Sequence, residues 1–302
     1  MLHFSKIVKN NILPHLYKRC LSHIKIVEVG PRDGLQNYPK FIKTKKKKRL
    51  INLLVKSGIK NIEATSFVPK NIIPQMKDNF KIMKHVSKIN SVNFSALVPT
   101  MKGYHNAIDS GTKEIAIFTT VSETFCQKNI KCSIKESLIR YAEICHRARK
   151  DKIKVRGYIS CIAGCPYEKE VSPYHVLDLS KKLLKLGCYE VSLGDTIGVG
   201  EPEQIDKLIS LLGAYIQLDK FAVHFHDTYG NALNNIKVAV NGGITVVDSS
   251  INGLGGCPFA PGAPGNVATE SVVKMLANLG FNTGIHYNKL LKAKKYTQSL
   301  IN

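Results

Sequence analysis

Two histidines spaced two residues apart, His224 and His226, are the strongest chemical signal in the sequence. On a β-strand, residues i and i+2 point to the same face, so both imidazoles would lie together while Phe225 points away. Two imidazoles on one face can chelate a divalent cation. Two polar core residues would give the same pattern. Because the pair ends an apolar run and Asp227 follows it, we interpret it as part of a metal site.

A second polar group stands in a turn flanked by glycine and proline, where Arg32 precedes Asp33. The carboxylate of Asp33 is a possible oxygen ligand, and the guanidinium of Arg32 can stabilise an enolate or carbonyl oxygen. An ion pair in a surface turn is the alternative. Glu63 ends a later apolar run and is expected to accept from Arg32, since a buried guanidinium needs a partner. Its alternative is a strand-end charge that reaches solvent.

The longest irregular stretch, Ile251–Asn266, contains five glycines and three prolines, which exclude a helix or a strand. Long loops in compact domains are usually functional or disordered. This loop holds Cys257, a candidate proton donor or nucleophile, although no adjacent histidine marks a nucleophile. Asn266 ends the loop and either caps the next helix or offers its side-chain carbonyl to a cation. The pattern leaves both roles open.

The rest of the chain repeats one unit, a short apolar run followed by a turn and a helical pattern. Eight such units in roughly 255 residues predict a parallel sheet, and favour a closed (β/α)8 TIM barrel over an open sheet. The expected strands are Ile24–Val29, Asn61–Thr65, Val92–Val98, Glu114–Thr120, Val155–Cys161, Glu190–Leu193, Phe221–His226 and Val246–Ile251. The expected helices are Ile42–Ser57, Pro74–Val86, Lys102–Ser110, Ile134–Arg149, Pro173–Leu186, Glu201–Leu212, Asn231–Asn241 and Val267–Leu279.

A barrel enzyme carries its catalytic groups at the C-terminal ends of the strands. All the groups above fall there, as do three residues that follow the sixth strand, Ser192, Asp195 and Thr196. Asp195 would orient Arg32 or a histidine, or would only stabilise the Gly-Asp-Thr turn that contains it. We expect Arg32, Gln36, Ser192 and Thr196 to contact the substrate.

Composition sets broader limits. The eight cysteines show no repeated metal-binding spacing, and no run of about 18 apolar residues predicts a membrane span. The net charge of +22 has two interpretations, a polyanionic partner such as nucleic acid or lysines spread over solvated helix faces. We favour the second, because little aromatic sequence interleaves the lysines.

The first 23 residues contain lysine, arginine and apolar residues but no aspartate or glutamate. That composition is typical of a mitochondrial transit peptide, and a disordered basic tail is the alternative. We therefore divide the chain into a leader at 1–23, a single barrel domain at 24–280 and a tail at 281–302 that packs near the barrel. The expected location is the mitochondrial matrix, with the cytoplasm as the alternative.

Five segments closely resemble the 3-hydroxy-3-methylglutaryl-CoA lyase family, and the resemblance runs from about Ile24 to about Leu291. They are Gly30-Pro31-Arg32-Asp33-Gly34-Leu35-Gln36, Glu63-Ala64-Thr65-Ser66-Phe67, Gly194-Asp195-Thr196-Ile197-Gly198, His224-Phe225-His226-Asp227-Thr228-Tyr229-Gly230 and Gly253-Leu254-Gly255-Gly256-Cys257-Pro258. The resemblance implies a TIM barrel, usually dimeric, that uses a divalent cation, Mg²⁺ or Mn²⁺, to cleave 3-hydroxy-3-methylglutaryl-CoA into acetyl-CoA and acetoacetate. Leucine degradation and ketone body formation are the implied settings, and the sequence does not choose between them.

Carried over by position, the resemblance implies roles for individual residues. The implied metal ligands are Asp33, His224, His226 and Asn266. The implied catalytic residues are Arg32 for the enolate, Glu63 and Asp195 as its supporting carboxylates, and Cys257 as the acid or base of the loop. The base is Asp33, His224 or a metal-bound water.

The sequence departs from the family pattern at Asn252, where the usual signature has a small residue such as alanine, and at Pro264, which makes the end of the loop Gly-Ala-Pro-Gly-Asn. The alternative enzyme is a Claisen-type acyltransferase of the same superfamily, similar to isopropylmalate or homocitrate synthase. Against it, those synthases usually continue into a large C-terminal region and lack the Gly-Gly-Cys-Pro loop.

Overall fold

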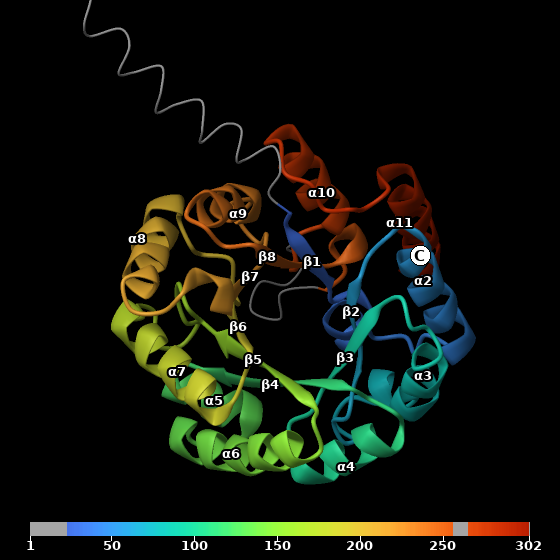
Figure 1. Ribbon diagram of the computed structural model, residues 1–302, viewed down its shortest axis with the longest axis horizontal. Coiled ribbons are helices and arrows are strands. Elements are labelled where there is room, and N and C mark those ends of the chain that lie inside the picture. Colours follow the sequence, from blue (N-terminus) through green and yellow to red (C-terminus); the bar gives the residue numbers. More distant parts are fainter. Residues whose placement is uncertain (1–22, 256–264, 302) are drawn as a thin grey trace, which may run out of the picture.

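Eight parallel strands form a closed barrel in which each strand pairs with its neighbours in the sequence and β8 closes onto β1. The structure, a computed structural model, describes residues 23–255 and 265–301. The strands are β1 Lys25–Glu28, β2 Asn61–Ser66, β3 Asn93–Leu97, β4 Glu114–Thr120, β5 Lys154–Ser160, β6 Glu190–Asp195, β7 Phe221–Phe225 and β8 Val246–Ser249. The predicted TIM barrel is confirmed, and Figure 1 shows its helices as an outer ring.

The ring contains a helix after every strand. These helices are α2 Thr44–Lys56, α3 Asn79–Val86, α4 Met101–Asp109, α5 Glu123–Ile130, α6 Ile134–Lys150, α7 Pro173–Leu186, α8 Pro202–Gly213, α9 Ala232–Asn241, α10 Thr269–Asn278 and α11 Tyr287–Ile301. Helix α5 lies inside the fourth connection, where the sequence pattern predicted only the longer helix α6. Its first turn is capped by the hydroxyl of Ser122, which accepts from the N–H of Phe125.

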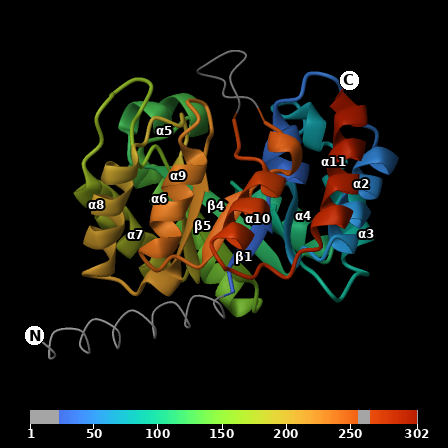
Figure 2. The same ribbon diagram turned by 90° about the horizontal axis from the view of Figure 1, so that it is seen from above.

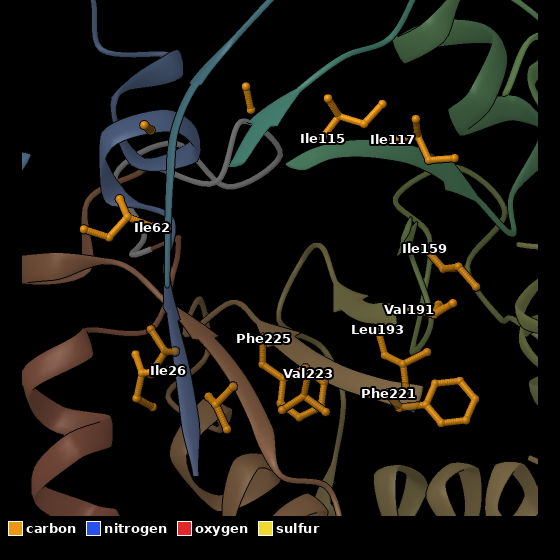
Figure 3. Packing of buried hydrophobic residues seen from close by; sticks show 14 of the residues in the cluster. Ile26, Ile62, Ile115, Ile117, Ile159, Val191, Leu193, Phe221, Val223 and Phe225 are labelled. Atoms are coloured by element: carbon orange, nitrogen blue, oxygen red, sulfur yellow. The ribbon is translucent and has the colours of Figure 1, made fainter. Parts of the chain in front are cut away.

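Alternation along the strands separates an apolar outer layer from the barrel interior. On β7, Phe221, Val223 and Phe225 pack under the helices, and Figure 3 shows Val191 and Leu193 of β6 in the same layer. The residues between them, His224 on β7 and Ser192 on β6, therefore face inward. Hydrophobic burial between barrel and helices thus holds the strands, while the interior positions remain available for polar groups.

The segment after residue 280, predicted as a tail, contains the 15-residue helix α11. Helix α11 lies beside α2 in both views of the molecule (Figures 1 and 2). The hydroxyl of Tyr38, in the connection before α2, donates to the main-chain oxygen of Ile301 at 2.6 Å. The C-terminal segment therefore closes the ring next to the connection that follows β1.

Exposed lysines occur on helices all around the ring, for example Lys45 on α2, Lys135 on α6, Lys181 on α7 and Lys207 on α8. Helices α2 and α7 lie on opposite sides of the barrel (Figure 1). This distribution is the one expected for solvated helix faces and differs from the single basic face that nucleic-acid binding predicts. None of the helices in the described ranges combines the length and hydropathy needed to cross a membrane.

Candidate metal centre and active site

The turn after β1 presents Arg32 and Asp33 from a short π-helix, η1, Gly30–Gly34. Two backbone constraints fix it. The N–H of Gly30 donates to Glu28 Oε1 at 2.8 Å, and a Cβ on Gly34 would lie 2.6 Å from the Cβ of Leu254. Only glycine permits that approach to the segment after β8. The glycines of this turn therefore bring Arg32 and Asp33 next to the end of β8.

His224 of β7 and His226, which directly follows this strand, meet Asp33 over the mouth of the barrel. One ligand atom from each of Asp33, His224 and His226 can be chosen so that all three lie within 4.8 Å of one another. The Nε2 atom of His224 is 3.8 Å from Asp33 Oδ2, and the two imidazole rings are 5.6 Å apart. Three of the four predicted ligands therefore form one cluster.

Asn266 completes the cluster from the chain segment that returns after the glycine-rich loop. The main chains of Asn266 and His226 form an isolated antiparallel β-bridge. The side-chain amide nitrogen of Asn266 donates to Asp33 Oδ2 at 2.8 Å and to Leu254 O at 3.0 Å. The N-cap of α10 is Ala268, so the interpretation of Asn266 as a helix cap is wrong. Both hydrogen bonds use the amide nitrogen, which leaves the carbonyl oxygen as the group a cation would take.

The protonation states of the cluster suit a cation. Burial raises the pKa of Asp33, but Arg32 and the histidines outweigh it and lower that pKa to about 2. Burial, with His224 as a like-charged neighbour, lowers the pKa of His226 to about 4. Both groups are therefore in their metal-binding forms at neutral pH, ionised carboxylate and neutral imidazole. The Nδ1 atom of His226 is buried without a hydrogen-bond partner, as expected of a nitrogen placed for a ligand.

Arg32 is buried, and Glu63 and Asp33 bind it from two sides. Its Nε atom donates to Glu63 Oε1, and its Nη1 atom donates to Asp33 Oδ1 at 2.5 Å. Burial opposes the charge on Arg32, but the two carboxylates dominate and raise its pKa, so the guanidinium stays protonated. The predicted pairing with Glu63 is confirmed. Glu63 is fully buried within β2, just before a β-bulge, and does not reach solvent as the alternative required.

Two residues that the sequence pattern did not single out, Arg156 on β5 and Asp248 on β8, connect these groups inside the barrel. The guanidinium of Arg156 makes two bonds to Asp248, at 2.7 and 2.9 Å. Asp248 Oδ2 lies 3.4 Å from His224 Nδ1, within ion-pair distance although Nδ1 forms no hydrogen bond, so its charge orients the imidazole from the side opposite Asp33. A charge at an inward position of an otherwise apolar strand was the signal that could have identified both residues.

Arg156 also reaches Arg32 through Tyr158. Its Nη1 atom donates to the Tyr158 hydroxyl at 2.8 Å, and that hydroxyl donates to Glu63 Oε2 at 3.1 Å. The ring of Tyr158 lies edge-on to the ring of His224. The Arg156 guanidinium therefore binds Asp248, which lies beside His224. It also binds Tyr158, which holds the carboxylate of Glu63.

Asp195, the last residue of β6, has partners other than those expected. The carboxylate of Asp195 accepts from the N–H groups of Val199 and Gly200 at 3.3 and 2.8 Å, and burial raises its pKa to about 6. The expectation that this carboxylate orients Arg32 or a histidine side chain therefore fails, although the main-chain oxygen of Asp195 accepts from the His226 N–H at 3.2 Å. Asp195 acts on the site through the backbone and shapes its own loop, as the alternative held.

The four residues expected to contact substrate divide into two kinds. Ser192 is fully buried and donates to Asp248 Oδ2 at 2.8 Å, and Thr196 accepts from the N–H of Cys161 at 2.9 Å. Both hydroxyls therefore have internal partners. Gln36, in contrast, keeps a buried side-chain oxygen without a partner, and Arg32 borders the cluster. Cys257 lies outside the described residues.

Comparison with known proteins identifies the family of this chain. A family model described as HMGL-like matches residues 23–296. The chain belongs to this family. It is 50% identical to "Hydroxymethylglutaryl-CoA lyase, mitochondrial" of Bos taurus over 92% of this chain and 86% of that protein. It is 47% identical to "3-hydroxy-3-methylglutaryl-CoA lyase, cytoplasmic" of Mus musculus, over 93% of this chain and 82% of that one.

A solved structure agrees with the family in fold as well. The hydroxymethylglutaryl-CoA lyase of Pseudomonas aeruginosa superposes with a TM-score of 0.91 at 44% identity, covering 93% of this chain and 94% of that chain. The resemblance inferred from the five sequence segments is therefore confirmed across the whole barrel.

Proposed function

We propose that this chain is a lyase that cleaves 3-hydroxy-3-methylglutaryl-CoA to acetyl-CoA and acetoacetate with the help of a divalent cation. The observation that carries the proposal is the cluster of Asp33, His224 and His226 directly beside the buried, protonated Arg32 at the mouth of the barrel. Carbon–carbon cleavage of this substrate needs a base for the tertiary hydroxyl and a positive group for the thioester enolate. Both kinds of group meet here.

The ligands of the cation would be Asp33, His224, His226 and the carbonyl oxygen of Asn266. The carboxylate and carbonyl oxygens among these donors suit Mg²⁺ or Mn²⁺, which are the cations that we propose. A bound cation would supply Lewis-acid chemistry and lower the pKa of a substrate hydroxyl. The lowered pKa values of Asp33 and His226 favour such binding at neutral pH.

The protein groups divide the proton and charge transfers. Arg32 faces the developing enolate oxygen, and Glu63 keeps its guanidinium from rotating away. The base is Asp33, His224 or a water molecule. The low pKa of Asp33 makes it a weak base, and the Nε2 atom of His224, which faces Asp33, cannot accept the proton while it binds the cation. Cys257 is proposed to return a proton to the enolate carbon.

The test is a cleavage assay on the purified protein with Mg²⁺ or Mn²⁺ and 3-hydroxy-3-methylglutaryl-CoA. Acetoacetate should form, should stop with a chelator, and should resume when the cation is restored. Condensation of acetyl-CoA with 2-oxoisovalerate in the absence of cleavage would instead establish the acyltransferase alternative. Cys257→Ala should lower kcat without loss of bound cation, and an unchanged kcat would remove Cys257 from the mechanism.

We further propose a homodimer in the mitochondrial matrix, with residues 1–23 as the leader, 24–280 as the barrel and 281–302 as a C-terminal segment. The acid-free leader sequence and the mitochondrial relative support the location, and the cytoplasmic relative keeps the alternative in view. A reporter fused to residues 1–23 should enter mitochondria, and a cytosolic reporter would refute the leader. Sedimentation of the purified chain measures the oligomeric state, and a monomer would refute the dimer.

A further inference from the structure

The turn that follows β8 is held by two buried carboxylates. This turn, η4, Ile251–Gly253, is a short 3₁₀ helix. The N–H of Ile251 donates to Glu28 Oε1 at 2.8 Å, and the N–H of Asn252 donates to Glu270 Oε2 at 3.0 Å. Glu28 comes from the end of β1 and Glu270 from the first turn of α10. Both carboxylates are almost fully buried, so the two backbone N–H groups are satisfied away from water.

The same turn leads directly to the candidate metal centre. The main-chain oxygen of Leu254, the next residue, accepts from the Asn266 amide at 3.0 Å, and that amide also binds Asp33 Oδ2 at 2.8 Å. A displacement of η4 would therefore move the acceptor that fixes which way the Asn266 side chain faces. The position of Asn252 therefore affects Asn266, a candidate ligand. The hydrogen bond of the Asn252 N–H holds η4, and the hydrogen bond of Leu254 O holds the Asn266 amide.

A buried carboxylate is costly unless a positive charge compensates it. Within the described parts of the chain, Lys294 of α11 is the one cation in ion-pair distance of Glu28 or Glu270, with its Nζ atom 3.0 Å from Glu270 Oε1. Its side chain is 35% exposed, whereas that of Glu270 is 4% exposed. Lys294 therefore links helix α11 to Glu270. Each oxygen of Glu270 has its own partner, Lys294 for Oε1 and the Asn252 N–H for Oε2.

We propose that Lys294 is a positioning residue for the metal centre. It holds the Glu270 carboxylate on the Asn252 N–H, which fixes η4 and, through Leu254 O, the orientation of Asn266. Helix α11 is then a functional part of the site although it contributes no ligand. This inference rests on the ligand role proposed for Asn266.

The decisive variants are Lys294→Met and, as a matched control, Lys292→Met. The control removes an exposed lysine of the same helix that forms no ion pair among the described residues. Titration of the purified full chain with Mn²⁺ should show weaker binding for Lys294→Met by about 3- to 30-fold, the range found for substitutions that act without touching the ligand. The kcat for cleavage should fall in parallel with little change in KM, and Lys292→Met should match the wild type.

A second pair of variants separates positioning from general stability. Glu270→Gln keeps an acceptor for the Asn252 N–H without a buried charge, so it should bind Mn²⁺ nearly as the wild type does. In that background Lys294→Met should cause no further loss. Equal Mn²⁺ binding by Lys294→Met and Lys292→Met, or an undiminished effect of Lys294→Met in the Glu270→Gln background, would overturn the proposal.

Amide hydrogen exchange makes the result independent of the proposed function. In the metal-free protein, a peptide covering residues 250–255 should exchange faster in Lys294→Met than in Lys292→Met, because the Asn252 N–H loses its fixed acceptor. Failure of the wild type to bind Mn²⁺ or to cleave the thioester would refute the proposed function and leave this comparison valid. Identical exchange in the two variants would refute the positioning role.

Discussion

Substitution of Asp248 by asparagine is the sharpest test of the network inside the barrel. Asp248 is 1% exposed, and its two oxygens receive two bonds from Arg156 and one from Ser192. The same carboxylate lies 3.4 Å from His224 Nδ1. Asparagine has nearly the same shape but carries no charge and replaces one acceptor with a donor. The change therefore removes charge and hydrogen bonding without leaving a cavity.

The size of the effect follows from these contacts. Breaking one side of a buried ion pair costs about 3–5 kcal/mol, because the remaining charge is uncompensated. Here Glu190 still accepts from Arg156 Nε at 2.7 Å, so we expect the lower end, about 3 kcal/mol of unfolding free energy. Loss of the group that orients a metal-binding histidine typically weakens binding by about 10- to 100-fold. Binding of Mn²⁺ should weaken by that factor.

Urea denaturation and Mn²⁺ titration of Asp248→Asn measure the two effects separately. Ser192→Ala is the control, since it removes one bond to the same carboxylate and leaves both charges in place. It should lower stability by about 1–3 kcal/mol while Mn²⁺ affinity stays close to that of the wild type. Mn²⁺ affinity within twofold of the wild type in Asp248→Asn would refute the claim that Asp248 orients His224.

Three further predictions concern single residues. Burial raises the pKa of Glu28 from 4.5 to about 7, so its contribution to stability is full below pH 4.5 and is lost as the pH rises through 7. Relative to Glu28→Gln, the wild type should lose about 3 kcal/mol between pH 4.5 and 8 in urea titrations, and parallel profiles would contradict the shift. Arg32→Lys keeps the charge but cannot span Glu63 and Asp33, so kcat should fall about 10²- to 10³-fold in steady-state assays, whereas an unchanged kcat would show that charge alone suffices. Asn252 has a left-handed φ of 58°, so Asn252→Ala should cost about 1–2 kcal/mol in thermal unfolding and Asn252→Gly less, an order that strain at this position requires.

The fold was predictable because periodicity and turn residues agree along nearly the whole chain. Each predicted strand is present, and most helix ends fall within a few residues of the predicted positions. Helix α5 was missed because it is short and buries only Phe125 and Cys126, which is too little for a helical pattern to show. The C-terminal helix α11 was missed as a helix because its many lysines resemble a solvated tail. Its apolar side nevertheless packs in the ring through Leu290, Ala293 and Leu300.

The site was predictable where its residues end a strand and unpredictable where they depend on tertiary contacts. His224, His226 and Asp33 follow from strand geometry and from the barrel rule that strand ends converge. The role of Asp248 depends on its distance to His224, which no spacing in the sequence encodes. Asn252 is a case between these two. Its backbone is left-handed, a conformation that asparagine adopts more readily than alanine, so the residue type fits the structure although the sequence alone did not indicate this conformation.

The buried ion pairs inside the barrel contain unequal numbers of acidic and basic side chains. The connected ion pairs of the barrel contain three cations and four carboxylates, namely Lys25, Arg156 and Arg32 with Glu190, Asp248, Glu63 and Asp33. The His226 imidazole, with its pKa near 4, adds no charge at neutral pH. Counted without His224, the side chains of these ion pairs carry one more negative charge than positive, and the member next to the histidines is Asp33. Buried ion pairs contribute little net stability, and Arg32 shares one positive charge between Glu63 and Asp33. We infer that this arrangement serves to place Asp33 at the mouth of the barrel with its charge only partly balanced, where a divalent cation would neutralise it.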